Sequence, residues 1–563
     1  MPTPSTNEDQ PVTLLHYFYH WEQQQPDKVY LRQPVGNQFV DYTWGEVGQQ
    51  ARRLATYLNS LGLPPGSNIG LISKNCAHWI IADLAILISG HVSVPFYPTL
   101  TGPQLRQVLD HSQCQVLIVG KIDNWPLLKP SVPESLPCVA FPDYTPNASA
   151  PDPDHTQWQT IQDQYAPLMG TPETGLDEVF SIVYTSGTTG NPKGVMVSYK
   201  AAWMALQTCR PQVYTDLPEA RFFSYLPLCH LAERSMVEFL NLCIGGTIYF
   251  AESLDSFAAN LVAARPTHFL GVPRIWTKFQ QGVLAKIPQQ KLDRLLRIPI
   301  VSGLVKRKIR QGLGLNDARL VITGAAPMPV PLIQWFRRLG IHILEVYGMS
   351  ESTAVISFMP RNAVKDGTVG RVLDGMEARF DPETNELLVR SNWLMMGYYR
   401  EPALTEAALP DGWLATGDVG ELDDEGYLKI TGRVKDKYKS PKGEYIAPVQ
   451  IELGFADNSF VEQIYVGGQL LPQPMALVVL SDTGRKADRL LVGQSLEQTV
   501  QSVNTQLYSY EHIRKVVVVK DPWSVENNQL TPTMKIKRNV IENHYKPYME
   551  RWFDQSETII WEE

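Results

Sequence analysis

The chain has 563 residues, of which 44% are hydrophobic and 19% are charged, and it carries a formal net charge of −8 with a pI near 5.8. This length exceeds what one hydrophobic core supports, so roughly three or four folding units are expected. The acidic balance argues against a general nucleic-acid binder, whose surface is basic. Six cysteines without a CxxC pair indicate reduced, packed thiols. The polar N-terminus indicates neither a secretory signal nor export, so we expect a cytoplasmic protein.

Helices and strands alternate in the first 120 residues. Thr43 and Glu46 form a capping box before a helix whose apolar positions recur at helical spacing as far as Gly62. The most apolar window, 79–96, contains Asp83 and Pro95, which indicates a buried helix and a strand and not a transmembrane helix. Strands alternating with helices predict a mostly parallel sheet. The predicted strands are 68–73, 92–94 and 115–120, and the predicted helices are 75–89 and 104–112.

The segment from Lys121 to about Asp177 is interrupted by many prolines, and we interpret it as an irregular surface connection. An apolar strand from Phe180 to Tyr184 follows it and leads into a loop rich in glycine, serine and threonine that ends at Lys193. Backbone N–H groups, hydroxyl groups and one lysine suit phosphate.

A kinase-type P-loop requires four residues between its glycines and a Gly-Lys-Ser/Thr ending. Only Thr188 and Thr189 separate Gly187 from Gly190, and Gly194 follows Lys193. The loop is therefore predicted to hold phosphate for a different chemistry, and the alternative is an ordinary surface loop.

Four segments are expected to converge because ligands bind beyond the carboxyl ends of parallel strands. A helix is predicted from Ser198 through Thr208, and strands are predicted at 222–226, 247–250 and 268–270. A β-α-β unit is predicted at 319–323, 331–339 and 341–346. The convergent segments are 185–193, 228–230, 324–326 and 347–351.

The pattern changes after Glu351. Apolar and polar residues alternate at 377–380 and 386–390 on either side of a turn, which predicts a hairpin. Short strands near 412–418 and 426–430 are expected to join it in a β-barrel-like subdomain at about 352–433. A basic, turn-rich stretch at 431–443 indicates a boundary, and strands are predicted at 464–466, 476–480 and 515–519. We expect an α/β fold with a large N-terminal domain of mostly parallel sheets, residues 1–433, and a small mobile α+β C-terminal domain, residues 434–563.

Five motifs occur in a fixed order: the 181–194 loop, Tyr347-Gly-Met-Ser-Glu351, Thr416-Gly-Asp418, Gly432-Arg433 and Lys535. Together they resemble the adenylate-forming (AMP-binding) superfamily over roughly residues 25 to 545. The segments 226–234 and 271–276, with 432–436 followed by 443–446, are similar to the long-chain fatty acyl-CoA synthetase branch. The resemblance implies that a fatty carboxylate attacks the α-phosphorus of Mg-ATP, and that the thiol of coenzyme A then displaces AMP.

The resemblance assigns the nucleotide site. It implies that Glu351, after Ser350, binds Mg²⁺ together with Thr185, that Tyr347 stacks on adenine, and that Asp418 beside Arg433 accepts from ribose. In each case the alternative is an ordinary side chain: a solvated Glu, a core aromatic or a turn Asp. The implied ATP and AMP ligands are Thr185, Ser186, Gly187, Thr188, Thr189, Gly190, Lys193, Gly324, Ala325, Ala326, Tyr347, Gly348, Met349, Asp418, Arg433 and Lys439.

The resemblance implies that Lys535 is the catalytic residue for adenylation. It also implies catalytic roles for Glu351 and Ser350. Lys535 would bridge the substrate carboxylate and the α-phosphate. Met534 stands where the family has glycine, which is a departure from the pattern. Lys435 corresponds to the family's hinge, and a solvated basic loop is the alternative there.

An acyl chain requires an apolar tunnel, worth about 0.8 kcal/mol for each buried CH₂. The candidates to line it are Trp203, His230, Met236, Phe239, Gly271 and Met349, although residues of these types more often belong to the plain core. The expected co-substrates are fatty acid, ATP and CoA, with Mg²⁺ as cofactor and with peripheral membrane contact among the expected interactions. Two enzymatic alternatives remain, an acyl-acyl carrier protein synthetase and a fatty acyl-AMP ligase. A non-catalytic nucleotide- or lipid-binding relative is the third.

Overall fold

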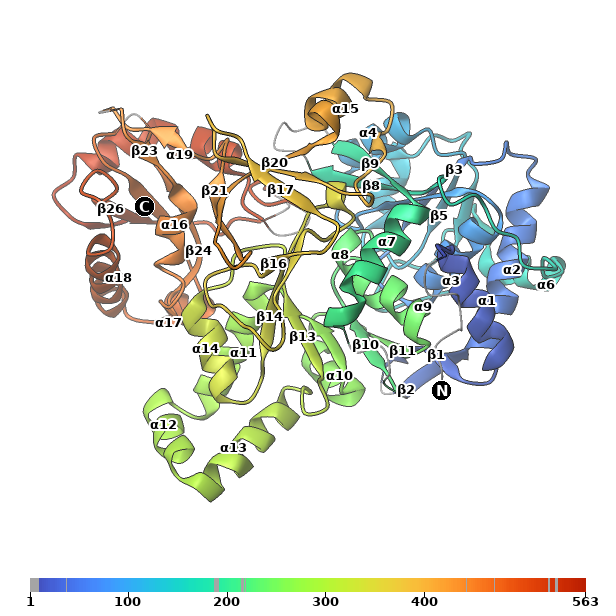
Figure 1. The fold of residues 1–563 in the computed structure, drawn as a ribbon, viewed down its shortest axis with the longest axis horizontal. Helices are drawn as coiled ribbons and strands as arrows, with labels where there is room; N and C mark the ends of the chain where they lie inside the picture. Colours follow the sequence, from blue (N-terminus) through green and yellow to red (C-terminus); the bar gives the residue numbers. More distant parts are fainter. Residues whose placement is uncertain are drawn as a thin grey trace.

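The computed structural model describes residues 10–36, 38–186, 192–213, 217, 219–441, 443–469, 471–524, 527–531 and 535–563, with only the backbone of Ser186. A large body built on two wide sheets is followed by a smaller C-terminal region, which we define as the residues from Tyr438 onward. Figure 1 shows this region, in orange and red, beside the body. The mixed α/β architecture confirms the predicted fold class.

The first wide sheet has eight strands and is parallel except at one edge. There, β9 returns antiparallel to β8, so the chain reverses at the glycine-rich loop predicted from the sequence. The strands, in spatial order, are β19 (Gly397–Tyr398), β9 (Pro192–Ser198), β8 (Val179–Ser186), β4 (Val92–Phe96), β3 (Asn68–Ile72), β5 (Val116–Val119), β6 (Cys138–Ala140) and β7 (Thr156–Gln157).

The second wide sheet has nine strands, with a parallel centre and antiparallel edges. It contains the predicted β-α-β unit, in which the helix α14 (Val330–Arg338) connects two adjacent parallel strands. In spatial order its strands are β16 (Arg371–Val372), β15 (Ser357–Phe358), β14 (Ile343–Tyr347), β13 (Leu320–Thr323), β12 (His268–Leu270), β10 (Arg221–Ser224), β11 (Thr247–Phe250), β1 (Val29–Val35) and β2 (Gln38–Thr43).

Helix α3 (Ala77–Ile88) lies between the two sheets. It packs on β1 of the nine-stranded sheet and on β3 and β4 of the eight-stranded sheet, and all twelve of its residues are buried. A helix that is apolar on every side is stable only in such an enclosed place. Helix α2 (Trp44–Ser60) packs beside it and begins at the predicted capping box of Thr43 and Glu46, which is confirmed.

The remaining helices cover the sheets and connect their strands. In the body they are α1 (Leu14–Gln24), α4 (Gly102–Ser112), α5 (Trp125–Leu128), η1 (Lys129–Ser131), α6 (Trp158–Gln164), α7 (Tyr199–Cys209), η2 (Arg210–Gln212), α8 (Leu231–Glu233), the π-helical η3 (Arg234–Phe239), α9 (Leu240–Ile244), α10 (Phe257–Ala264), α11 (Pro273–Lys286), α12 (Gln289–Arg297), α13 (Pro299–Gly312), η4 (Ser350–Ser352), α15 (Pro402–Ala408) and η5 (Pro410–Gly412).

A four-stranded antiparallel sheet completes the body. The hairpin predicted at 377–380 and 386–390 is confirmed with the same bounds as β17 (Glu377–Phe380) and β18 (Glu386–Arg390). The strands β20 (Leu414–Leu422) and β21 (Leu428–Arg433) follow in the sheet.

The C-terminal region has a two-stranded ribbon and a four-stranded mixed sheet. Helices α16 and α18 pack on one face of the mixed sheet, and α19 packs on the other. The elements are β22 (Tyr438–Lys439), β23 (Tyr445–Ile446), α16 (Pro448–Leu453), β24 (Val461–Gly467), β25 (Met475–Leu480), α17 (Asp482–Lys486), α18 (Arg489–Asn504), β26 (Lys515–Val518), α19 (Arg538–Phe553) and β27 (Ile559–Trp561).

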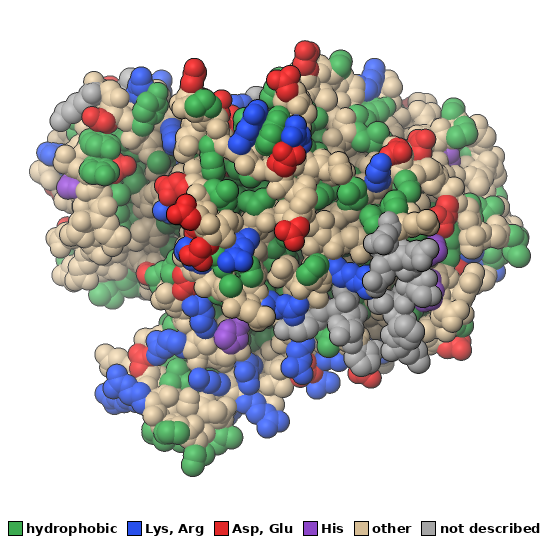
Figure 2. Space-filling model, viewed as in Figure 1, with side chains coloured by type: hydrophobic (Ala, Val, Ile, Leu, Met, Phe, Trp, Pro, Cys, Tyr) green, Lys and Arg blue, Asp and Glu red, His purple; other side chains and the backbone are tan. Residues whose placement is uncertain are grey.

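The proline-rich segment 121–177 is more ordered than the sequence interpretation allowed. Strands β6 and β7 extend the eight-stranded sheet, and Trp158 and Ile161 of α6 are buried against the core. Short strands at a sheet edge have too few residues to show a period, which explains the error. The sequence interpretation also missed the hairpin of α12 and α13, which projects from the body (Figure 1, Figure 2).

A buried polar network connects the layers at the centre of the body. The guanidinium of Arg234 in η3 contacts Asp83 of α3 at 2.5 Å and donates to Glu238 at 2.9 Å, and all three side chains are almost fully buried. Arg234 also donates to Ser181 of β8 at 2.7 Å. Burial and the neighbouring Asp83 raise the pKa of Glu238 well above its ordinary value, so Glu238 keeps its proton and one cation balances one anion.

Among the helices of the described ranges, none is both long enough and apolar enough to cross a membrane.

Replacing Arg234 with methionine should destabilise the fold strongly, because Asp83 would remain buried without a counter-ion. The expected loss is about 3–5 kcal/mol, measured as a fall in the unfolding midpoint. Arg106→Met is the matched control, because it breaks an exposed pair with Asp110 that is worth only ~0.3–0.5 kcal/mol. Adding Asp83→Asn to Arg234→Met should recover part of the loss, and equal midpoints for both single variants would contradict the role of the network.

Candidate active site

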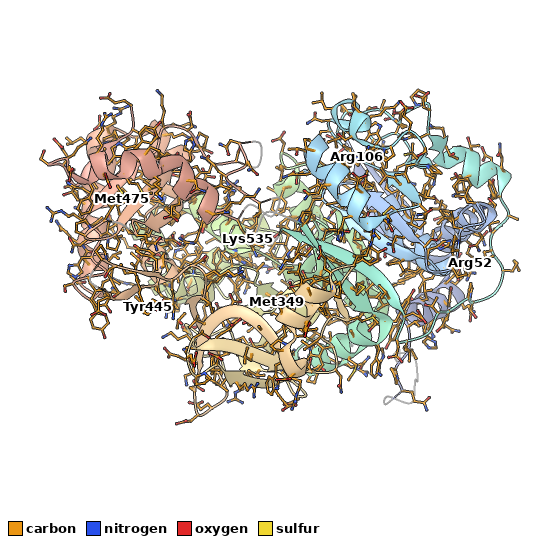
Figure 3. All side chains as sticks on the ribbon, turned by 90° about the horizontal axis from the view of Figure 1, so that it is seen from above. Arg52, Arg106, Met349, Tyr445, Met475 and Lys535 are labelled. Carbon is orange, nitrogen blue, oxygen red and sulfur yellow. The ribbon has the colours of Figure 1, made fainter. Side chains whose placement is uncertain are left out.

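A cavity of about 2380 Å³ opens where the strands β8, β13 and β14 end against the C-terminal region. In Figure 3, Lys535 lies between the C-terminal region, where Met475 is labelled, and the body that carries Met349. All four segments expected to converge contribute at least one residue to the cavity. The predicted site residues that line it are Thr185, Lys193, His230, Met236, Gly324, Ala325, Ala326, Tyr347, Gly348, Met349, Ser350, Glu351, Asp418, Arg433, Lys435 and Lys535.

Asp418 is a hydrogen-bond acceptor shared by two of these residues. Antiparallel pairing of β20 with β21 places it opposite Arg433, whose Nε donates to Oδ1 at 2.9 Å. The hydroxyl of Tyr347 donates to Oδ2 at 2.6 Å. Burial and the adjacent carboxylate raise the pKa of Tyr347 well above its ordinary value, so its hydroxyl remains a donor. Each carboxylate oxygen keeps a further lone pair that can accept from a ligand hydroxyl.

Glu351 and Lys193 are connected through Tyr398, a residue that the sequence interpretation did not single out. The Tyr398 hydroxyl donates to Oε1 of Glu351 at 2.8 Å, and Nζ of Lys193 lies 5.0 Å from the centroid of the Tyr398 ring. Strand β19, which carries Tyr398, pairs with β9, which carries Lys193. The acidic and the basic side chain are thus fixed to one aromatic residue. This link depends on strand pairing, and no local motif around Tyr398 could have predicted it.

The predicted metal ligands, Glu351 and Thr185, both line the cavity. Tyr398 occupies one Glu351 oxygen, which leaves the other for a cation. Within the described residues, no group of three His, Cys, Asp or Glu side chains is placed to hold a metal ion. This donor set fits a Mg²⁺ that arrives with a polyphosphate, since such ions use one or two carboxylates together with phosphate oxygens and water.

Small residues bring the backbone close to the cavity after β13 and β14. A Cβ on Gly324 would lie 2.7 Å from the carbonyl oxygen of Val346, and one on Gly348 would lie 2.2 Å from that of Ala354. Ala325 has a positive φ of 65°, which is strained for a residue with a side chain. Larger side chains at these positions would displace the adjacent strand ends, so the small residues preserve the shape of the cavity.

Lys535 enters the cavity from the loop that precedes α19. Its backbone N–H donates to Oγ1 of Thr531 at 3.0 Å, and Thr531 N–H donates to the Lys535 carbonyl at 2.7 Å. The side chain is exposed to the open cavity, yet the surrounding walls displace much of its water. This desolvation and the nearby cation of Arg433 lower the pKa of Lys535, while Asp418 acts in the opposite direction.

His230 lines the cavity near Lys535. Its Nδ1 accepts a hydrogen bond from the backbone N–H of Ala232 at 3.2 Å. Burial, followed by the charge of Lys535, lowers the pKa of His230 to about 4. The ring is therefore neutral at pH 7 and carries its proton on Nε2.

An ion pair holds the C-terminal region in this position. Arg274 of α11 pairs with Glu462 of β24, and Arg485 lies 3.6 Å from the same carboxylate. On the C-terminal side, Arg538 at the start of α19 pairs with Asp436 at 3.3 Å and with Glu452. These contacts place the loop of Lys535 at the cavity.

One part of the cavity is apolar. Helix α7 presents small and apolar residues to it at the helical spacing i, i+3, i+4 and i+7, and residues near α8, η3 and α9 face them. We call this part the apolar arm. It is lined by Ala202, Ala205, Leu206, Cys209, Val213, Leu231, Met236 and Leu240. The spacing was visible in the helix predicted from Ser198 to Thr208 and could have identified Ala202, Ala205 and Leu206, whereas the residues from later elements gave no such signal.

Four predicted site residues do not line the cavity. Trp203 is partly buried against the main core, and Phe239 packs 5.4 Å from the Arg234 guanidinium. Gly271 is enclosed by Trp276, and the ammonium of Lys439 lies 5.1 Å from the Tyr445 ring. Gly187, Thr188, Thr189, Gly190 and the side chain of Ser186 lie outside the described residues.

Comparison with known families and proteins gives near full-length matches. A family model described as AMP-binding enzyme matches residues 18–399, and one described as AMP-binding enzyme C-terminal domain matches residues 439–557. The chain is 28% identical to the long-chain-fatty-acid–CoA ligase ACSBG2 of Xenopus laevis, with 97% of this chain and 84% of that protein covered. It is also 28% identical to the long-chain-fatty-acid–CoA ligase FadD15 of Mycobacterium tuberculosis, with 99% of both covered.

Among solved structures, the adenylation domain of a carboxylate reductase from Mycobacterium chelonae aligns with a TM-score of 0.81 at 24% identity. The alignment covers 97% of this chain and 92% of that structure. At this level of identity the match demonstrates a shared fold.

The ε-amine of Lys535 should titrate below 10.5, the ordinary value for lysine, because it is desolvated and lies near Arg433. The measurement is an NMR titration of ¹³C-methylated lysines, with Lys535→Arg used to assign the resonance. Arg433→Met should raise this pKa and Asp418→Asn should lower it further, because a lysine is charged below its pKa and these changes remove a repelling and an attracting charge. Unchanged titration in both variants would contradict the geometry.

Proposed function

The chain belongs to the AMP-binding enzyme family, and we propose that it is an ATP-dependent fatty acyl-CoA synthetase. It joins a fatty acid to coenzyme A and releases AMP and pyrophosphate. The observation that carries this proposal is that polar groups suited to a nucleotide, the Lys535 amine and an apolar arm share one cavity. Relatives that match over 84% and 99% of their own length are named long-chain-fatty-acid–CoA ligases, which supports the proposal.

In the first step, a carboxylate oxygen of the fatty acid attacks the α-phosphorus of Mg-ATP, and the bond to the β-phosphate breaks. Two anions must approach each other in a chain whose net charge is −8. Several cations line the cavity and offset this repulsion, and four of them are residues implied for the site: Lys193, Arg433, Lys435 and Lys535. Lys535 bridges the carboxylate and the α-phosphate, so its charge acts where the negative charge concentrates in the transition state.

The nucleotide occupies the strand ends of β13, β14 and β20. Tyr347 stacks on adenine beside Gly324, Ala325 and Ala326, whose small side chains let the backbone approach the base. Asp418 accepts hydrogen bonds from the ribose hydroxyls with its free lone pairs. Thr185 and Glu351 bind the Mg²⁺ that accompanies ATP, and Ser350 begins the short helix that positions Glu351. Lys193 and the loop from Ser186 to Gly190 hold the pyrophosphate that leaves.

In the second step, the thiol of coenzyme A loses its proton, its sulfur attacks the acyl carbonyl, and the bond to AMP breaks. The C-terminal region rotates about Lys435 between the steps, which withdraws Lys535 and brings Lys439 toward the nucleotide phosphate. Lys439 lies away from the cavity in the present arrangement, which is consistent with a role only after rotation. The Arg274–Glu462 pair must break during this movement.

The acyl chain lies in the apolar arm, and His230 lies between the arm and Lys535. A neutral His230 fits this place, because a protonated His230 would be repelled by the positive charge of Lys535. Met236 lines the arm directly, Trp203 and Phe239 belong to the main core that the arm's residues also join, and Gly271 lies against Trp276 in a separate core cluster.

Release of pyrophosphate should increase with the chain length of the acid until the arm is filled. Each further buried CH₂ should increase kcat/KM roughly fourfold, equivalent to about 0.8 kcal/mol. The experiment measures pyrophosphate from ATP with saturated fatty acids of increasing length, with and without CoA. Equal thioester yield with an acyl carrier protein would favour the carrier-protein alternative, and the absence of acid-dependent pyrophosphate would contradict the proposal.

The same measurement of pyrophosphate release across chain lengths, repeated with the Ala205→Phe variant, tests whether the apolar arm holds the acyl chain. The added ring should shift the preference toward shorter acids and lower kcat/KM for long acids by about tenfold or more, since several CH₂ groups lose their place. Met204→Phe is the matched control, because Met204 is the adjacent residue on α7 and does not line the cavity. A chain-length profile unchanged by Ala205→Phe would move the acyl site elsewhere.

Lys535→Ala should cripple formation of the acyl-adenylate and spare thioester formation from supplied acyl-adenylate. The physical reason is that the lysine offsets repulsion only when carboxylate and phosphate approach each other. The two half-reactions are measured separately in single-turnover assays. Equal loss in both would show that Lys535 acts through folding or in a step common to both.

A further inference from the structure

The hairpin of α12 and α13 projects from the nine-stranded sheet side of the body and lies away from the cavity. Leu292 and Ile309 are buried where the two helices pack together, with Leu296 and Val305 partly buried beside them. In Figure 1 the two helices extend below the rest of the molecule. The hairpin therefore presents a tip and an outer face that other elements of the body do not cover.

The tip of the hairpin is apolar. Ile298, Ile300 and Leu304 have 50%, 82% and 64% of their surface exposed. Ile300 and Leu304 are four residues apart on α13 and share one face. Figure 2 shows green side chains at the lower end of the projection.

The sides of the hairpin are strongly basic. Between Gln289 and Gly312 the chain has seven Lys or Arg residues and one Asp, in a protein whose net charge is −8. The single acidic residue, Asp293, pairs with Arg338 of α14. The exposed cations are Lys291, Arg294, Arg297, Arg307 and Lys308, and Figure 2 shows Lys and Arg side chains over the same projection.

We propose that the tip of this hairpin docks on an anionic phospholipid surface. Ile298, Ile300 and Leu304 enter the boundary between headgroups and acyl chains, and the flanking cations bind the lipid phosphates. A nucleic acid or an acidic protein surface would satisfy the cations and leave the apolar tip in water. A bilayer surface satisfies both. The overall negative charge of the chain disfavours binding by the rest of the surface, which orients the molecule on its hairpin.

The docked orientation is connected to the cavity through α11. The residues of α11 that line the cavity include Pro273, Arg274, Thr277 and Lys278, and the same helix continues to Lys286 just before the hairpin. Helix α11 thus runs from a cavity wall to the base of the hairpin, and α12 continues from there to the tip. This inference concerns residues outside the cavity and does not depend on the proposed reaction.

Vesicle co-sedimentation of the full chain tests the proposal, using phosphatidylcholine vesicles with and without phosphatidylglycerol. The protein should sediment with the anionic vesicles, and binding should weaken as salt is raised. Arg307→Glu/Lys308→Glu should reduce vesicle affinity by about tenfold or more. Ile300→Asp/Leu304→Asp should also reduce vesicle affinity, and this loss should persist when the fraction of phosphatidylglycerol in the vesicles is raised.

Matched controls separate the hairpin from general charge and hydrophobicity. Lys520→Glu/Lys546→Glu makes the same charge change in the exposed C-terminal region, and Met169→Asp places an acid at a residue that is 86% exposed. Both should bind vesicles as the unmodified chain does. All variants should keep their unfolding midpoint and their pyrophosphate release with a short, soluble acid, so a failure of the reaction is distinguished from a failure of docking.

No binding to anionic vesicles, or equal binding by the hairpin and control variants, would overturn the proposal. Binding of single-stranded RNA in place of vesicles, lost in Arg307→Glu/Lys308→Glu, would reassign the hairpin to an acidic polymer. Hairpin-dependent self-association in sedimentation velocity, without vesicle binding, would reassign it to a second copy of the chain.

Discussion

A buried ion pair holds the body of this enzyme together. Arg234 of η3 meets Asp83 of α3, the helix between the two wide sheets, and Ser181 of β8 and Glu238 complete the hydrogen bonds. Removing two charges from water is costly unless each meets a partner in good geometry. The pair therefore tolerates little movement of α3, β8 or η3. Because His230 and Met236 lie on or beside η3, the same constraint fixes one wall of the cavity.

The reaction brings two anions together and therefore requires positive charge in the cavity, although the chain as a whole is negatively charged. The protein is acidic, yet cations from several elements line the cavity, among them one from β9, two from or just after β21, and Lys535 from the loop before α19. Lys535 belongs to the C-terminal region, so the completed charge pattern exists only in this arrangement. The Arg274–Glu462 pair stabilises it through exposed or half-buried charges, which makes the contact strong enough to position Lys535 and weak enough to break. A site completed by a movable part can serve two successive steps.

The outer surface fits an enzyme whose acid substrate partitions into lipid. The hairpin of α12 and α13 combines an apolar tip with basic sides, and α11, which lines the cavity, leads to the base of this hairpin. Substrate capture and chemistry would then take place in separate parts of the molecule. Neither requires a helix that crosses the bilayer.

Local sequence determined much of this protein. The capping box at Thr43, the 377–390 hairpin and the β-α-β unit from β13 to β14 follow from hydrogen bonding and periodicity over a few residues, and the structure confirms them. The five ordered motifs identified the family, which the family-model matches confirm. Most of the described residues that they assign to the site line the cavity. The sequence could not show that Tyr398 connects Glu351 to Lys193, that Arg274 meets Glu462, or that Phe239 and Gly271 pack behind the cavity wall. The contacts of Tyr398 and Arg274 join residues that are 47, 188 and 205 positions apart, and only the pairing of strands and the docking of the C-terminal region brings them together.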